Sequence, residues 1–343
     1  MVNVEDLRKE AKRILKEGKV KYVIGYERGE NGLMAKPAFI KDPDDVDRMI
    51  WDATCVHNLT KFLVDEKKRK AAEKKPDERP VGIVVKGCDS RAIVVLLQEK
   101  YIDREDIHIL GVSCEKNGVI DEKKLAKKLK GKTAKKIVQE EDRNFMVTTS
   151  DGTIKVQAEE ILAERCLECL ANYPVIYDLL LGDKSKKKID APYKSLEKLE
   201  SLTEKERWNF WAEELSKCIR CYACRSACPM CYCEECVVDT INFAVTADTP
   251  AAEKAGKIKW VEKSPIRSEN FVYHMVRAMH LAGRCIDCGE CERVCPMDIP
   301  LRFLNKKLEK EAKELFGYDA GYDPDVPSLV SSFKDEDPED FIR

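Results

Sequence analysis

Cysteine is the residue type in this 343-residue chain whose number and spacing point to chemistry, since there are 16 cysteines and only four histidines. The N-terminal stretch Met1 to Glu17 mixes charged and apolar residues and does not resemble a secretory signal, so we expect a cytoplasmic protein. Cytosolic thiols are kept reduced, which argues against disulfides. Metal ligation is the better interpretation, and soft thiolate ligands select zinc or iron-sulfur clusters.

Two cysteine runs share the spacing C-x2-C-x2-C-x3-C-P, which is typical of bacterial ferredoxins. In such a run three thiolates hold one 4Fe-4S cluster, and the fourth cysteine ligates the other cluster. We therefore assign one cluster to Cys218, Cys221, Cys224 and Cys295. We assign the second cluster to Cys285, Cys288, Cys291 and Cys228. A pair of four-cysteine zinc sites is the alternative, but such sites use separate C-x2-C pairs.

Four further cysteines form a candidate third 4Fe-4S site. Cys88 lies between an expected strand and an expected helix, and Cys114 directly follows another expected strand. If these strands are parallel neighbours, both thiols lie at the carboxyl edge of the sheet, where open α/β sheets bind ligands. The helix N-terminus would also favour the thiolate of Cys88. Cys166 and Cys169, spaced C-x2-C, complete the set of four, for which a zinc site or buried structural thiols are the alternatives.

The remaining four cysteines are Cys55, Cys231, Cys233 and Cys236. The last three form a closely spaced C-x-C-x2-C triplet that could supply three ligands to a fourth metal site, with Cys55 as the remote fourth ligand. In the competing interpretation Cys55 is a buried small hydrophobic residue, and one or two cysteines of the triplet only pack around the clusters without binding metal.

The elements expected to position these thiols divide the chain in two. Up to about residue 158, strands alternate with helices, which indicates an α/β domain. The expected strands are Val20 to Glu27, Pro80 to Lys86, His108 to Val112 and Lys135 to Gln139, with a hairpin of Phe145 to Thr149 and Thr153 to Gln157. The expected helices are Val4 to Glu17, Asp89 to Glu99 and Glu122 to Leu129, and then Ser268 to Ala282 and Arg302 to Phe316 in the cysteine-rich half.

The expected fold class is an α/β N-terminal domain followed by a mainly α-helical dicluster ferredoxin module. We place the α/β domain at 1–182, a lysine-rich linker at 183–207, the helical module at 208–318 and a C-terminal arm or tail at 319–343. The stretch Asp65 to Arg79 is expected to be a solvated loop or a helix end. The segment Pro229 to Arg284 between the two runs is far longer than the spacer of a compact ferredoxin, which favours the helical type of module.

Two resemblances to known families add to these expectations. Arg277-Ala-Met-His-Leu-Ala-Gly-Arg284 resembles the α-helical ferredoxin domains of fumarate and succinate oxidoreductases and heterodisulfide reductases. Between about Val81 and Asp178, the chain resembles the β-subunit family of coenzyme F-420-reducing hydrogenases and formate dehydrogenases. Three segments carry this resemblance: Gly87-Cys88-Asp89-Ser90-Arg91-Ala92, Leu110-Gly-Val-Ser-Cys114 and Arg165-Cys166-Leu-Glu-Cys169. This second resemblance implies an iron-sulfur cluster, an FAD, and electron transfer between a hydrogenase or formate dehydrogenase partner and the deazaflavin. The residues themselves do not locate FAD, because the chain has neither a glycine-rich phosphate loop nor G-x-G-x-x-G.

Charge and hydropathy argue against other classes of protein. The 61 basic and 63 acidic side chains nearly cancel, so we expect neither nucleic acid nor an anionic membrane as a partner. The longest apolar runs are far short of the ~20 residues of a membrane span. The four histidines lie apart from one another and are expected to be structural: His57, His108, His274 and His280.

We therefore expect a multi-cluster iron-sulfur electron-transfer subunit of an anaerobic oxidoreductase complex. Its expected partners are catalytic subunits of the formate dehydrogenase, hydrogenase or heterodisulfide reductase type, because no molybdenum, tungsten or nickel-iron site is recognisable in the sequence. Two other hypotheses remain. The chain would be a flavin-containing subunit that itself oxidises or reduces coenzyme F-420 or a nicotinamide, or a non-redox zinc scaffold.

Overall fold

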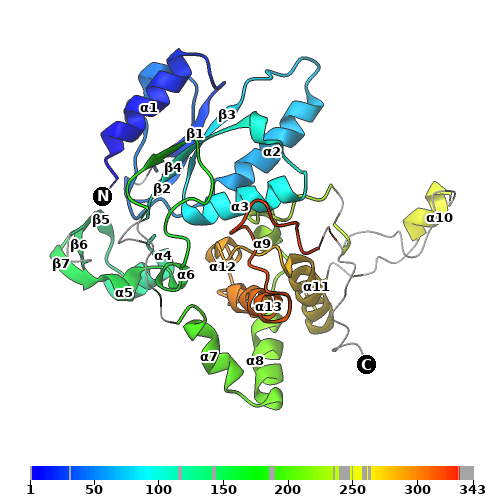
Figure 1. The fold of residues 1–343 in the computed structure, drawn as a ribbon. Coiled ribbons are helices and arrows are strands. Elements are labelled where there is room, and N and C mark those ends of the chain that lie inside the picture. Colours follow the sequence, from blue (N-terminus) through cyan, green and yellow to red (C-terminus); the bar gives the residue numbers. More distant parts are fainter. Residues whose placement is uncertain are drawn as a thin grey trace. The chain divides into compact units, whose positions relative to one another are not determined.

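The structure is a computed structural model that describes residues 2–30, 32–114, 118–140, 144–184, 189, 191–234, 236–238, 248, 250–256, 261, 264–330 and 332. The chain forms two compact units (Figure 1). The first unit combines Met1–Pro192 with Asp319–Arg343, and the second consists of Tyr193–Tyr318.

A five-stranded sheet in the order β2-β1-β3-β4-β8 forms the centre of the first unit (Figure 1). Its strands are β1 (Val23–Arg28), β2 (Ala35–Ile40), β3 (Val81–Val85), β4 (Ile107–Val112) and β8 (Leu179–Leu181). The pairs β1/β3, β3/β4 and β4/β8 are parallel, and only the edge pair β1/β2 is antiparallel. Every residue of β3 is buried, as expected for an inner strand of a parallel sheet covered on both faces.

Three helices of the first unit pack their apolar sides inward. They are α1 (Val4–Lys16), α2 (Thr60–Ala72) and α3 (Gly87–Gln98), and the short 3-10 helices η1 (Pro43–Arg48) and η2 (Arg104–Asp106) join them. The side chain of Asn3 caps α1 by accepting a hydrogen bond from the Glu5 N–H. Helix α2 extends to Ala72, into the stretch where the sequence predicts a loop or a helix end.

A second sheet of the first unit is antiparallel, in the order β5-β6-β7. It consists of β5 (Ala134–Gln139), β6 (Asn144–Thr149) and β7 (Gly152–Gln157), with α4 (Glu122–Leu129) and α5 (Ala158–Ile161) beside it. The sequence assigns Lys135 to Gln139 to the main α/β alternation, but this segment pairs with the hairpin instead. Phe145 and Val147 of β6 are fully buried, so this sheet has a core of its own.

The C-terminal segment, predicted to be an arm or tail, belongs to the first unit and packs on α3. Arg91 of α3 donates a hydrogen bond from Nε to the Ala320 carbonyl (2.9 Å), and its guanidinium lies over the ring of Tyr322. Gly321 has a φ of +72° and approaches the Arg91 backbone so closely that a Cβ would lie 2.3 Å from the carbonyl oxygen. The rest of the predicted tail, residue 331 and residues 333–343, lies outside the described residues.

Helices are the only regular secondary structure among the described residues of the second unit. Its helices are α7 (Lys194–Glu200), α8 (Glu204–Ser216), α9 (Ala223–Ser226), α10 (Ala251–Gly256), α11 (Arg267–Leu281), α12 (Glu290–Arg293) and α13 (Leu301–Phe316). Helix α7 lies where the sequence predicts a linker, and its Glu200 forms ion pairs with Lys307 and Lys310 of α13. The expected combination of an α/β N-terminal region and a helical C-terminal region is confirmed.

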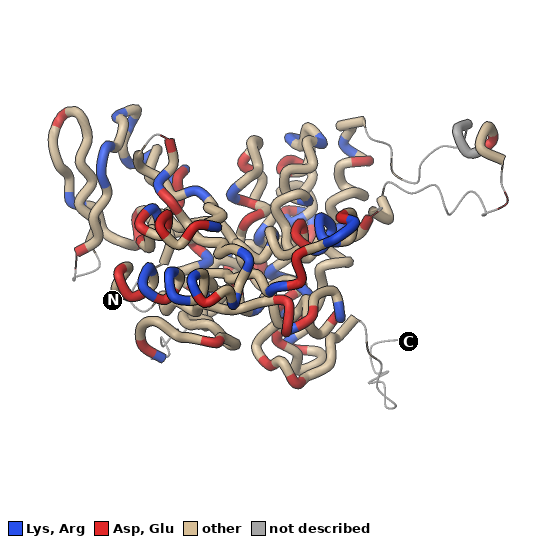
Figure 2. Tube along the Cα trace, turned by 90° about the horizontal axis from the view of Figure 1, so that it is seen from above, with Lys and Arg blue, Asp and Glu red and all other residues tan. Residues whose placement is uncertain are grey.

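Basic and acidic residues are interspersed along the described chain, as Figure 2 shows for the helices of both units. No helix among the described residues is both long and apolar enough to cross a bilayer.

Candidate metal centres

Cys88 and Cys114 lie at the same edge of the five-stranded sheet. Strands β3 and β4 are parallel neighbours in which Val85 pairs with Gly111. Cys88 follows β3 in the first turn of α3, and Cys114 follows β4, where its N–H donates to the Asn172 carbonyl (2.7 Å). The condition on which the predicted third site depends, parallel pairing of these two strands, is therefore met.

The short helix α6 (Glu164–Leu167) brings the C-x2-C pair to the same place. Burial, followed by the nearby thiols of Cys166 and Cys169, raises the pKa of Cys114 to about 12. The thiol of Cys114 is in turn among the groups that raise the pKa of Cys88. Cys166 accepts a hydrogen bond at Sγ from the Val119 N–H (3.3 Å), a type of contact that holds and tunes cluster sulfurs. Cys114 thus lies within electrostatic range of the other three cysteines of the predicted third site.

A buried charge pair lies behind Cys88. Lys86 Nζ is 3.0 Å from the Asp89 carboxylate and donates to the His57 carbonyl (2.6 Å), with both charged side chains almost fully enclosed. Burial works to lower the pKa of Lys86, but Asp89 and Tyr26 raise it well above its ordinary value. For Cys88 the expected effect of the helix N-terminus does not prevail, because burial and the Asp89 carboxylate raise its pKa. Lys86 could not be singled out from the sequence, because its burial is visible only in the fold.

In the second unit the two ferredoxin runs adopt the same backbone loop. The third residue of each run has a positive φ, which is 57° for Arg220 and 52° for Asp287. The fifth residue of each run also has a positive φ and caps the start of a short helix. It is Tyr222 (61°) before α9 and Gly289 (65°) before α12. Left-handed residues placed in this way turn backbone N–H groups toward a common concavity, as in nests that bind anions and iron-sulfur clusters.

Contacts between the runs support the crossed assignment of ligands. Burial raises the pKa of Cys218, and the thiols of Cys224 and Cys295 raise it further, so Cys295 lies beside the first run. One cavity brings together the four thiols assigned to the second cluster: Cys228, Cys285, Cys288 and Cys291. Each run therefore has the fourth cysteine of the other run as its neighbour.

Charged side chains hold the loop of the second run. The Asp287 carboxylate, between Cys285 and Cys288 in the chain, accepts two hydrogen bonds from Arg302 (2.7 and 2.9 Å) and one from Lys306 (2.7 Å). Burial tends to raise the pKa of Asp287, but the two cations lower it to about 2. Asn305 points its amide toward Cys291 Sγ at 3.6 Å.

The arrangement of the thiols bears on the kind of metal site. A cubane takes one thiolate at each of its four irons, so it needs four cysteines around one enclosure. The shared cavity and the paired loops are the features that fit cubanes.

The four cysteines of the predicted fourth site are divided between the units. Cys231 lies beside Cys228, and this contact raises its pKa far above the ordinary value. Cys233 is exposed and Cys236 is partly buried. Cys55, in the first unit, is fully buried, and burial raises its pKa to about 12. A site that joins Cys55 to the triplet stays a prediction.

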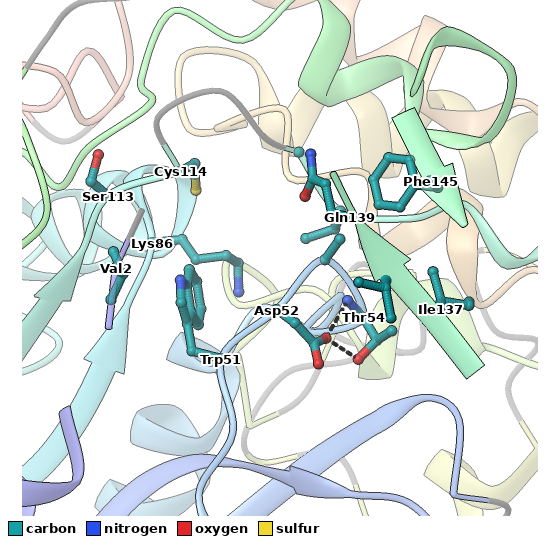
Figure 3. A pocket seen from close by; sticks show the side chains of 14 residues that line it. Val2, Trp51, Asp52, Thr54, Lys86, Ser113, Cys114, Ile137, Gln139 and Phe145 are labelled. Carbon is teal, nitrogen blue, oxygen red and sulfur yellow. Dashed lines mark hydrogen bonds between the residues drawn. The ribbon is translucent and has the colours of Figure 1, made fainter. Parts of the chain in front are cut away.

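A cavity of the first unit reaches Cys114. Trp51, Thr54, Lys86 and Cys114 line it together with Gln139 and Phe145 from the three-stranded sheet (Figure 3). On its floor the Asp52 carboxylate accepts a hydrogen bond from the Thr54 N–H (2.8 Å). An aromatic ring, a cation and a thiol therefore share one cavity at the carboxyl edge of the main sheet.

Comparisons with known proteins agree with this geometry. Residues 213–299 match the family described as a 4Fe-4S dicluster domain. The F420-dependent formate dehydrogenase subunit beta of Methanocaldococcus jannaschii is 23% identical over 93% of this chain and 92% of its own length. The F420-dependent formate dehydrogenase 1 subunit beta of Methanococcus maripaludis is 26% identical over 93% of this chain and 91% of its own length.

A solved structure, the F420-reducing [NiFe] hydrogenase complex from Methanosarcina barkeri studied by xenon derivatization, contains a chain that matches 50% of this one. That match covers 64% of the hydrogenase chain at 16% identity, with a TM-score of 0.34. The resemblance predicted from the sequence is confirmed by the two curated relatives and the domain match: this chain is similar, over nearly its whole length, to formate dehydrogenase beta subunits and carries a 4Fe-4S dicluster domain at residues 213–299.

Proposed function

We propose that this chain is a multi-cluster iron-sulfur electron-transfer subunit of a cytoplasmic oxidoreductase complex. The observation that carries the proposal is the cavity in which Cys228 of the first run joins Cys285, Cys288 and Cys291 of the second. Bound clusters would supply one-electron transfer. The residues of the chain hold the clusters, bury them and set the charge around them, which is how a protein tunes their potentials.

The partner proposed for this subunit is a catalytic formate dehydrogenase subunit. Two relatives named as formate dehydrogenase beta subunits match 93% of the chain, which supports this choice over a hydrogenase or a heterodisulfide reductase. Clusters exchange electrons without making or breaking substrate bonds, so the chemistry of the substrate is assigned to the partner.

A third cluster is proposed in the first unit. Its ligands would be Cys88, Cys114, Cys166 and Cys169, which the parallel strands β3 and β4 and helix α6 bring together. Because Asp319–Arg343 belongs to the same unit, a fragment ending near residue 183 would lack part of it. The full chain is therefore the form to test.

The test is iron and acid-labile sulfide analysis of the anaerobically purified full chain. The two clusters of the dicluster domain predict about eight irons per chain, and a third cluster raises this to about twelve. Cys295→Ser should damage the cluster of the first run, and Cys228→Ser that of the second, while Ser216→Ala on the surface of α8 serves as a control. Zinc with almost no iron would overturn the proposal in favour of a zinc scaffold.

The fourth site is tested in the same measurement. If Cys55 closes a cubane with the triplet, the chain holds about sixteen irons. Cys55→Ala should then remove about four of them, and so should Cys233→Ser. An iron content near twelve that Cys55→Ala leaves unchanged would show that Cys55 is a buried structural residue.

A second candidate function is a flavin-containing subunit that itself oxidises or reduces coenzyme F-420 or a nicotinamide. The cavity beside Cys114 favours it, because Trp51 offers a ring for stacking and Lys86 offers a cation. Denaturing the purified protein should release flavin, and Trp51→Ala should lower the flavin content without changing the iron content. Protein that holds iron and releases no flavin would support the electron-transfer subunit alone.

A further inference from the structure

Arg277 on α11 is an arginine enclosed among the cysteines of the second unit. Only 7% of its surface is exposed, and an NH2 group of its guanidinium donates to the Cys224 carbonyl (2.9 Å). It lines the same cavity as the four thiols assigned to the second cluster. The Nε of Arg277 has no hydrogen-bond partner among the described residues, so a donor remains available inside this enclosure.

The groups around Arg277 include thiols of both ferredoxin runs and the thiol of Cys231. Burial works to lower the pKa of Arg277, but four cysteines raise it well above the ordinary range: Cys231, Cys228, Cys224 and Cys291. Cys224 belongs to the first cluster in the crossed assignment, while Cys228 and Cys291 belong to the second. Arg277 thus lies within electrostatic range of ligands of both clusters.

Other charges near this helix do not neutralise Arg277. His274, one turn earlier, is buried, and its pKa is lowered to about 3 by burial and by the positive charges of Arg277 and Arg220. Glu290 is paired with Arg293 at 2.7 Å. Among the described residues, no carboxylate lies within ion-pair distance of Arg277. A buried cation without a carboxylate is costly unless other negative charge compensates it.

We propose that Arg277 is a positioning residue that serves as the shared counter-charge of the two clusters and raises the reduction potential of both. The inference rests on the proposed two-cluster function. Reduction adds one electron to a cluster and breaks no bond, so the reduced state carries more negative charge. A fixed positive charge and N–H donors nearby stabilise that state and make the cluster easier to reduce.

The experiment is an anaerobic redox titration of the full chain with dithionite, followed by electron paramagnetic resonance of the dicluster unit. Arg277→Gln should lower the potentials of both clusters. Arg277→Lys keeps the charge, so its potentials should stay closer to those of the wild type. Arg207→Gln is the control, because Arg207 lies in the same unit and, among the described residues, donates to the backbone carbonyls of Glu200 and Leu202.

The outcomes separate this inference from the proposed function. If Arg277→Gln retains the iron content of the wild type and has unchanged potentials, or shifts the potential of one cluster alone, the shared role is wrong. If Arg277→Gln does not fold, Arg277→Lys tests the proposal instead. A folded lysine variant with both cluster potentials markedly lowered would show that the positive charge does not set these potentials. Wild-type protein without iron would overturn the proposed function itself.

Discussion

Gly118 lies so close to Cys166 that a Cβ on the glycine would come within 2.2 Å of the Cys166 Cβ and 2.9 Å of its Sγ. Gly118 has no left-handed φ, so close approach is the reason for glycine at this position. Gly118→Ala should displace the Cys166 thiol and cost the proposed third cluster, which is about four irons per chain. Iron analysis of the anaerobic full chain checks this.

The matched control for that substitution is Gly25→Ala in β1. There the nearest atom to a new Cβ is the flexible end of Met49 at 2.9 Å, which can move aside. Gly25→Ala should keep the full iron content. A Gly118→Ala protein with unchanged iron and an unchanged visible spectrum would contradict the role of Cys166 as a ligand.

The Lys86–Asp89 pair behind Cys88 should contribute to stability because both charges are buried. Lys86→Met removes the cation that lies 3.0 Å from the enclosed Asp89 carboxylate, and loss of one partner of a buried pair typically costs about 3–5 kcal/mol. Asp89→Asn keeps a cap for the Lys86 N–H, so the double variant should lose less than the two single variants together. Urea unfolding of the three proteins measures this coupling, and strictly additive losses would refute it.

The 4Fe-4S dicluster domain could be predicted from the sequence, because cysteine spacing within a run is a local property. The crossed position of Cys295 beside Cys218 follows from the run itself, and the parallel pairing of β3 and β4 follows from alternating strands and helices. Long-range pairings could not be predicted in this way. The edge strand β2, the short β8 and the return of the segment at Ala320 to α3 leave no periodic signal in the chain.

Buried charges were the other part that sequence reasoning missed. Arg277 and Lys86 look like ordinary surface residues in a chain with 61 basic side chains. A signal for Arg277 does exist, since it shares a face of α11 with Tyr273 and Leu281, both of them buried. A charge on the apolar face of a helix that leads into a cysteine run is therefore a sign of a residue placed for its charge.

Arg302 should be needed for the second cluster because it anchors Asp287 inside the second run. Arg302→Met removes two hydrogen bonds from this carboxylate and frees a loop that holds Cys285 and Cys288. We expect a loss of about four irons, with the first cluster retained. Lys307→Met on the same helix is the control, since its pair with Glu200 lies closer to solvent. Iron analysis with electron paramagnetic resonance distinguishes the clusters, and equal losses in both variants would refute the anchoring role.

His274 should make the stability of the second unit depend on pH. Its pKa is lowered to about 3 in the folded protein, because burial and the charges of Arg277 and Arg220 disfavour the imidazolium. In the unfolded chain a histidine has a pKa of about 6.5. Between about pH 6.5 and pH 3 the unfolded chain therefore binds a proton at this histidine and the folded chain does not. The contribution of His274 to the free energy of unfolding is present above about pH 6.5 and is lost as pH falls toward 3. Between pH 7 and pH 5.5 the free energy of unfolding should drop by about 1 kcal/mol from this group.

His274→Gln should remove this pH dependence of the free energy of unfolding, measured by anaerobic urea unfolding. His280→Gln, at an exposed position of the same helix, should keep it. Equal slopes in the wild type and His274→Gln would mean that the folded protein accommodates the protonated ring.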